Sequence, residues 1–144
     1  MLAYGSKTWV LSKPDEASLG VFEKKILRTI SGPKNANGDL RLRYNNELYT
    51  LYKENDIVTY TKINRLRWAG HVIRLEEQSP ARRVLVAVVQ GRRQRGRPKL
   101  RWKDGMMEDA RKLGERNWRN TARNKDSWQN VLNKALAQKG LFCQ

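Results

Sequence analysis

Residues 12 to 33 read Ser-Lys-Pro-Asp-Glu-Ala-Ser-Leu-Gly-Val-Phe-Glu-Lys-Lys-Ile-Leu-Arg-Thr-Ile-Ser-Gly-Pro, and this stretch holds a complete set of signals for one helix. Ser12 is suited to cap the first turn, with Asp15 three residues later to complete a capping box and Pro14 inside that turn. Apolar residues then recur at helical spacing, with charged residues between them. Gly32, followed by proline, ends the pattern. The stretch therefore predicts an amphipathic helix that begins after Ser12 and ends before Gly32.

Helical spacing of apolar residues recurs through the rest of the chain. We expect a polar loop at 34–39 and a short helix at 80–89, although the β-branched residues 84–89 leave a strand as the alternative. The other helices are expected after Asn46, after Asp56, from Trp102 to Leu113, from Trp118 to Ala122, and from Asp126, with Gln129 completing its capping box, to Gly140. The predicted fold class is all-α, with small helical bundle units at 1–89 and 102–144 joined by a basic linker at 90–101 that contains Gly and Pro.

The charge of the chain points to a polyanionic partner. Thirty Lys and Arg against fourteen Asp and Glu give a formal net charge of +16. Such an excess repels itself in a compact state, so we expect it to serve a partner more than the fold. Nucleic acid is favoured over a membrane surface, because the cations are not confined to one face of a long apolar helix.

The residue types present exclude several classes of site. One Cys, at position 143, and one His cannot supply the four ligands of a structural zinc site, and a lone thiol forms no disulfide framework. The acidic residues Asp104, Glu108 and Asp109 are interpreted as partners of neighbouring arginines and not as metal ligands. No apolar stretch is long enough to cross a bilayer, and residues 1–11 are too short and polar for a signal peptide. We therefore expect an intracellular protein, nuclear or cytoplasmic, without a metal or another cofactor.

Residues 91 to 103, here called the basic ribbon, are the most basic part of the chain: seven of these positions are Arg or Lys and none is acidic. Gly91, Gly96 and Pro98 disfavour a regular helix or strand, so an extended segment that contacts phosphates is predicted. Its centre, Arg95-Gly96-Arg97-Pro98-Lys99, resembles an AT-hook, whose arginines enter the narrow minor groove of A·T-rich DNA. Phosphate contact without groove preference is the favoured interpretation, and minor-groove reading and an inert linker are the alternatives.

A second basic group surrounds the single histidine. Arg65, Arg67 and Arg74 are expected on the basic face of the helix that follows Asp56, close to Trp68 and His71. Trp68 could stack on a base, as could Trp102 beside the basic ribbon, but packing in a small helical core is the favoured interpretation of both. No nucleophile or carboxylate can be assigned as a catalytic partner of His71, so no enzymatic site is predicted.

Four blocks, read in order, resemble the region that follows the palm domain in the reverse transcriptases of non-LTR retrotransposons. The first two are Tyr4-Gly5-Ser6-Lys7-Thr8-Trp9, with Lys7 where the family pattern has Glu, and Phe22-Glu23-Lys24-Lys25-Ile26-Leu27-Arg28. The third is Arg65-Leu66-Arg67-Trp68-Ala69-Gly70-His71-Val72-Ile73-Arg74, and the fourth is Arg95-Gly96-Arg97-Pro98-Lys99 with Trp102-Lys103-Asp104. Together they cover nearly the whole chain, which makes their combination far more specific than any single block.

The resemblance implies the thumb and C-terminal tail of an endonuclease–reverse transcriptase, which would grip template RNA or an RNA/DNA hybrid behind the active site. It implies no polymerase activity for this chain, because the palm aspartates that hold Mg²⁺ in such enzymes have no counterpart here. The palm domain would be a further partner, and the apolar residues 1–11 are expected to pack on it. Some related elements carry a C-terminal Cys/His knuckle, which has no counterpart in this sequence.

We therefore expect a non-catalytic nucleic-acid-binding segment, with RNA, an RNA/DNA hybrid or A·T-rich DNA as its ligand. The alternatives are a protein-interaction module, docking through the helices at 19–30 and 128–136, and an inactive retroelement relic. The residues expected to contact nucleic acid are Arg92, Arg93, Arg95, Arg97, Lys99, Arg101 and Lys103 in the basic ribbon, Arg65, Arg67 and Arg74 in the second group, and Trp68 and Trp102 as candidates for stacking.

Overall fold

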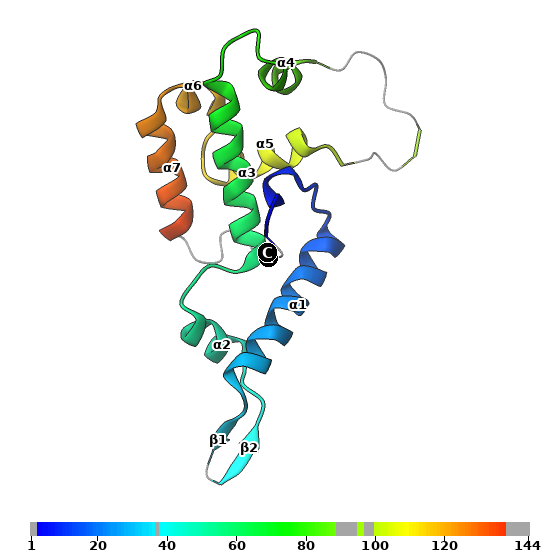
Figure 1. Cartoon of the computed structure of the whole chain (residues 1–144), viewed down its shortest axis with the longest axis vertical. Helices are drawn as coiled ribbons and strands as arrows, with labels where there is room; N and C mark the ends of the chain where they lie inside the picture. The colour runs from blue at the N-terminus through cyan, green and yellow to red at the C-terminus, as the bar shows by residue number, and fades with distance from the viewer. Residues whose placement is uncertain (1–2, 37, 89–94, 97–99, 138–144) are drawn as a thin grey trace.

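The computed structural model describes residues 3–36, 38–88, 95–96 and 100–137, and within them the chain is mostly helical, which confirms the predicted all-α class (Figure 1). None of the described helices is long and apolar enough to span a membrane. In chain order the elements are the 3-10 turn η1 (Ser6–Thr8), α1 (Lys13–Ser31), β1 (Lys34–Ala36), β2 (Asp39–Arg41), α2 (Asn45–Tyr52), α3 (Ile57–Ile73), α4 (Pro80–Val86), α5 (Trp102–Lys112), α6 (Trp118–Arg123) and α7 (Lys125–Ala137).

Helix α3 is the centre of the fold. It contacts η1, α1, α4, α5, α6 and α7, while α1, α2 and the β1–β2 hairpin extend away from this bundle (Figure 1). One cluster of buried apolar side chains joins α3 to α4, α5, α6 and α7, so residues on both sides of the basic ribbon share a core. Its members are Ile63, Leu66, Ala69, Val72, Ile73, Leu85, Met106, Ala110, Trp118, Ala122, Trp128, Val131, Leu132 and Ala135. The division into separate N-terminal and C-terminal units stays a prediction.

The crossing of α7 over α3 depends on one glycine. Gly70 is buried at the point where the indole of Trp128 lies against α3, and a Cβ at this position would overlap that ring. The Trp128 Nε1–H donates a hydrogen bond to the backbone oxygen of Leu66, at 3.1 Å. Trp128 is 1 % exposed, so this polar group finds its partner inside the core. Gly70 thus permits a closer approach than any larger residue would.

Helix α1 confirms the signals read from residues 12 to 33. The Ser12 backbone N–H donates to Asp15 Oδ2 at 2.9 Å, and the Asp15 N–H donates to Ser12 Oγ at 3.3 Å, which completes the capping box. Gly32 follows the last helical residue with φ of 63°, a conformation that favours glycine. Inside the helix, the buried carboxylate of Glu23 accepts hydrogen bonds from the Tyr49 hydroxyl at 2.8 Å and the Ile57 N–H at 2.9 Å. Glu23 therefore ties α1 to α2 and to the start of α3.

The expectation of a polar loop at 34–39 is wrong, because residues 34–36 and 39 belong to the two strands of a short antiparallel hairpin. Gly38 turns the chain with φ of 95°, and its N–H donates to the Asn35 side chain at 3.0 Å. Lys34 lies opposite Arg41, a pairing of like charges that would be unfavourable alone. Glu47 of α2 accepts hydrogen bonds from both cations, at 2.9 Å and 2.8 Å, and neutralises the pair. The hairpin depends on this carboxylate from outside it, so local sequence did not reveal it.

The other helix starts are partly as expected. Asp56 caps α3 by accepting from the Thr59 N–H at 2.9 Å, which confirms that prediction. Helix α2 starts one residue before Asn46, after Tyr44 as its N-cap. The capping box expected between Asp126 and Gln129 is wrong. Helix α7 begins at Lys125, one residue before Asp126, and Asn124 Oδ1 accepts a hydrogen bond from the Asp126 N–H at 2.9 Å. Residues 84–86 are helical, so the strand alternative is wrong for them.

Candidate nucleic-acid interface

A groove of about 870 Å³ runs along the exposed face of α3. It is lined by residues 3–7, by α3 and by the first two turns of α7. None of the described residues that line it is acidic. The lining therefore offers its cations to an anionic ligand without a carboxylate beside them to compete for it. The cations that line this groove, called here the α3 groove, are Lys7, Arg67, Arg74 and Lys125.

Arg67 and Arg74 are two evenly placed cations of the α3 groove. They lie seven residues apart on one face of the helix, which places their backbones roughly 10 Å apart along the axis at 1.5 Å per residue. Arg67 Nη1 donates to Asn64 Oδ1 at 2.7 Å, and Arg74 Nη1 donates to the backbone oxygen of Ala122 at 2.8 Å. Neither guanidinium forms an ion pair with a carboxylate that the structure describes. Both side chains are exposed and keep donors for an anionic ligand.

Arg65 does not fit the exposed basic surface expected from the sequence. It is 3 % exposed and forms an ion pair with Asp109 of α5, which is also 3 % exposed. Burial raises the pKa of the Asp109 carboxyl, and the nearby Arg65 charge opposes that shift. On the next side of α3, the buried Lys62 pairs with Glu16 of α1 at 2.7 Å. Lys62 and Arg65 therefore hold α1 and α5 to α3, and a ligand in the α3 groove would meet neither.

Trp68 and Trp102 are both partly buried and pack against the core cluster. The Trp102 Nε1–H donates to the backbone oxygen of Lys7 at 2.7 Å, which fixes η1 against α5. The Lys7 ammonium lies 4.3 Å from the centroid of the Trp68 ring and so occupies a ring face that a base would need. These contacts support packing as the role of both tryptophans. His71, in contrast, is exposed in the α3 groove, with its ring 5.2 Å from that of Trp68.

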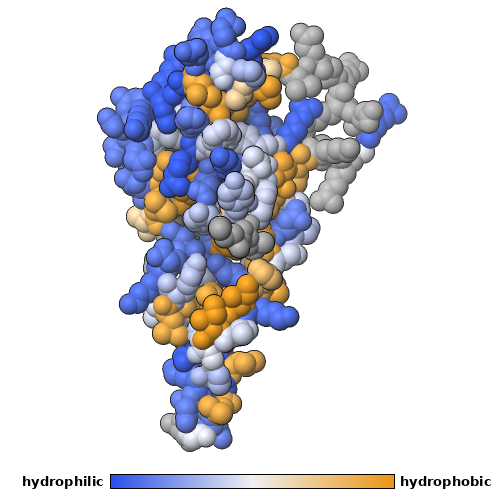
Figure 2. All heavy atoms as spheres, in the orientation of Figure 1, coloured by the Kyte–Doolittle hydropathy of each residue, from blue (hydrophilic) through white to orange (hydrophobic). Residues whose placement is uncertain are grey.

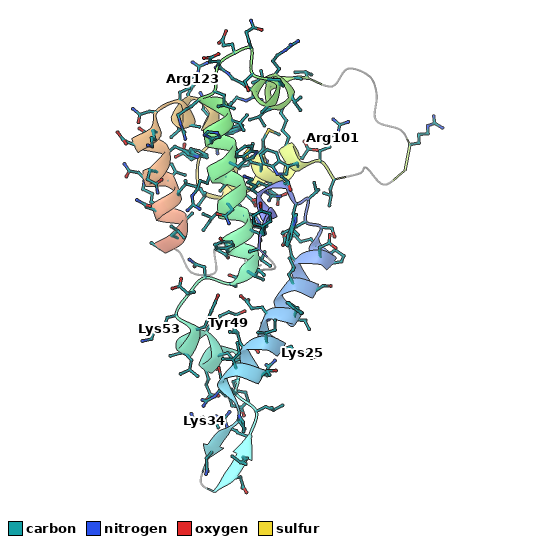
Figure 3. All side chains as sticks on the ribbon, in the orientation of Figure 1. Lys25, Lys34, Tyr49, Lys53, Arg101 and Arg123 are labelled. Carbon is teal, nitrogen blue, oxygen red and sulfur yellow. The ribbon has the colours of Figure 1, made fainter. Side chains whose placement is uncertain are left out.

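Much of the basic ribbon lies outside the described residues, including Arg92, Arg93, Arg97 and Lys99. Arg95 and Arg101 are exposed, and Figure 3 shows Arg101 just before α5, apart from α7 in this view. Lys103 is partly buried, and its Nζ donates to the backbone oxygen of Ala87 at 3.1 Å. Burial lowers the pKa of Lys103, and the charge of Arg119 adds to this effect. Lys103 is thus held by contacts within the fold, whereas Arg95 and Arg101 are exposed.

The carboxylates that follow the ribbon serve the fold. Asp109 pairs with Arg65, which agrees with its interpretation as the partner of an arginine, whereas Glu108 lies 3.8 Å from Lys112, a lysine one turn along the helix. Among the described residues, no group of three or more His, Cys, Asp and Glu side chains is placed to hold a metal ion.

Sequence reasoning missed several lining residues of the α3 groove: Lys7, Lys125, Tyr4 and Tyr60. They belong to three segments that meet only through tertiary packing, and no local pattern links them. No protein-family model matches the chain, and no curated protein or solved structure shows detectable similarity to it. The assignment of this interface therefore depends on the geometry and chemistry of the chain's own residues.

Proposed function

We propose that the chain is a non-catalytic nucleic-acid-binding module, which contacts the phosphate backbone through the α3 groove. The observation that carries the proposal is the convergence of Lys7, Arg67, Arg74 and Lys125 on one groove without an acidic lining residue. Phosphate contacts of this kind release counterions, and they suit a chain with a net charge of +16. The exposed Arg95 and Arg101 allow the basic ribbon to add further phosphate contacts from its own segment.

The ligand class follows from the resemblance to the tail of non-LTR reverse transcriptases. We infer RNA or an RNA/DNA hybrid as the ligand, with A·T-rich duplex DNA as the alternative if the Arg95-Gly96-Arg97-Pro98 core enters a minor groove. A palm domain of a polymerase is proposed as a second partner. In the structure, η1 packs on α3 and Ser6 is buried, so part of the N-terminal segment already has a partner within the chain.

The test compares two double variants that remove the same charge. Arg67→Ala with Arg74→Ala removes the regular pair of the α3 groove, while Arg83→Ala with Arg111→Ala removes two exposed arginines on α4 and α5 that do not line it. Binding is measured by fluorescence anisotropy on labelled single-stranded RNA, RNA/DNA hybrid and A·T-rich duplex across a salt series. Losing two phosphate contacts should reduce the slope of log affinity against log salt by about 1.4 to 1.8. Equal effects of the two variants, or an unchanged slope, would show that the α3 groove is not the site.

A protein-docking module is a second candidate, and one observation favours it. Phe22, Ile26 and Ile30 of α1 are 46 %, 42 % and 76 % exposed, and they line an apolar groove of about 590 Å³ next to α3. Figure 2 shows apolar side chains gathered over this part of the molecule. The second docking helix expected from the sequence does not offer a free apolar face, because Trp128 and Leu132 are each 1 % exposed within the core. Absence of nucleic-acid binding in the same salt series would favour this candidate.

A further inference from the structure

The α3 groove combines cations with exposed tyrosines. Tyr60 lies seven residues before Arg67 on the same face of α3 and is 48 % exposed. Tyr4, from the segment that lines the groove beside α3, is 87 % exposed. Neither tyrosine belongs to the core cluster, although Tyr60 also borders the apolar groove beside α1. Two large aromatic faces are therefore available to a ligand in the groove.

The order of side chains along α3 is regular. The groove-lining residues Tyr60, Asn64, Arg67, His71 and Arg74 recur every three or four positions, which keeps them on one face of the helix. From the first to the last, this strip is about 21 Å long at 1.5 Å per residue. A stacked strand rises about 3.4 Å per nucleotide, so the strip spans at most about six nucleotides.

An aromatic face and a cation recognise different parts of a nucleic acid. A guanidinium binds a phosphate, whereas a tyrosine ring gains most by stacking on the face of a base. In a duplex the bases are stacked on each other and paired, so a groove-lining tyrosine would meet only the backbone unless the duplex were opened. An unpaired strand offers both groups at once.

Trp68 is less suited to this task than the tyrosines, although it also lines the groove. The Lys7 ammonium lies over its ring at 4.3 Å, and the hydrogen bond from Trp102 to the Lys7 backbone holds that segment in place. The same anchoring positions residues 3–7, and with them Tyr4, beside α3. The tryptophans thus serve as packing residues of the groove wall, while Tyr4 and Tyr60, together with His71, present exposed rings to a ligand.

We propose that the α3 groove binds single-stranded nucleic acid, with Tyr4 and Tyr60 stacking on bases while Arg67 and Arg74 contact phosphates. This inference rests on the proposed function and narrows its ligand to unpaired strands of about six nucleotides or fewer per site. It assigns stacking to residues that differ from the tryptophans expected from the sequence.

The test uses labelled six- and twelve-nucleotide oligo-U and oligo-dT strands together with a twelve-base-pair duplex. In the Tyr4→Ala/Tyr60→Ala variant, affinity for either strand should fall about fivefold or more for each stacked base, while affinity for the duplex changes less than about twofold. The Tyr4→Phe/Tyr60→Phe variant keeps the rings and should restore binding. Tyr44→Ala is the matched control, because Tyr44 is 65 % exposed but lies outside the groove. The oligo-U to oligo-dT ratio reports whether RNA or DNA is the preferred strand.

The outcomes separate the inference from the proposed function. If Arg67→Ala/Arg74→Ala weakens binding but the tyrosine variant binds all ligands as the wild type does, the phosphate site stands and the single-strand inference is wrong. Equal losses for strands and duplex in the tyrosine variant would also overturn it. If the arginine variant has no effect, the proposed function fails and the inference fails with it. Thermal melts of every variant confirm that affinity changes are not losses of fold.

Discussion

Gly70→Ala should destabilise the chain, although alanine is the better helix former. At this position the indole of Trp128 crosses α3, and a Cβ would overlap its Nε1 and Cδ1 and lie 3.0 Å from Cε2. The ring cannot turn aside freely, because it is 1 % exposed and lies 6.2 Å from the ring of Trp118, centroid to centroid. The strain must therefore be relieved by moving α7 away from α3.

The magnitude follows from two losses and one gain. Overpacking a filled core costs about 1–3 kcal/mol, and moving the indole leaves the Trp128 N–H without its Leu66 partner, which costs about another 1–3 kcal/mol. Replacing glycine by alanine inside a helix returns about 0.5–1 kcal/mol. We expect a net loss of about 1–5 kcal/mol in the free energy of unfolding.

The assay is urea denaturation followed by circular dichroism and tryptophan fluorescence, with Gly20→Ala as the control. Gly20 lies inside α1, and the nearest atom to its Cβ would be Lys24 Nζ at 4.0 Å, so this variant should be stabilised by about 0.5–1 kcal/mol. The wild-type and Gly70→Ala proteins should show the same dependence on urea but different midpoints. If Gly70→Ala is as stable as the wild type or more so, α7 does not pack on α3 at this residue and the shared core is wrong.

Two further predictions concern buried and bridging charges. Arg65→Met should lower the free energy of unfolding by about 3–5 kcal/mol, because it leaves Asp109 buried without its cation. In the same urea assay, the double variant Arg65→Met/Asp109→Leu should recover much of this loss. A double variant as unstable as the single one would contradict this. The hydrogen bonds from Arg41 and Lys34 hold the pKa of Glu47 well below its ordinary value of 4.5. The Glu47 carboxylate should therefore stabilise the hairpin fully above about pH 4.5, and this stabilisation is lost as the pH falls towards the lowered pKa. The protection factors of the strand amides at 34–36 and 39–41, which compare each exchange rate with the intrinsic rate at the same pH, should therefore fall on acidification in the wild type. In Glu47→Gln they should be low already near neutral pH, and equal protection in both proteins would refute the bridge.

The parts of this fold that could be predicted are those set by neighbours in sequence. The Ser12–Asp15 capping box and the Asp56 cap each depend on residues three positions apart, and both are present. The hairpin at 34–41 was missed because its like-charged pair is stabilised by Glu47, from the next helix. Residues close in sequence predict helix caps and helical periodicity, but they do not show which distant carboxylate will neutralise a cation.

The candidate site shows the same limit on a single helix. Lys62, Arg65, Arg67 and Arg74 all belong to one basic stretch in the sequence, and their chemistry does not distinguish them. Packing does: carboxylates on α1 and α5 lie against the first two, while the other two face the α3 groove. The direction of each cation depends on where α1 and α5 dock, which is long-range information.

Helix α3 is both the centre of the core and part of the lining of the groove. Substitutions that disturb the core should therefore weaken binding, whereas substitutions that weaken binding need not disturb the core. A ligand that binds only the folded chain raises its melting temperature by mass action. Substitutions that move α7 from α3, such as Gly70→Ala, displace Lys125 and should weaken binding as well as folding. Substitutions of exposed groove residues, such as Arg67 and Tyr60, should weaken binding while leaving the unliganded stability nearly unchanged. A binding site located elsewhere on the chain would not produce this asymmetry.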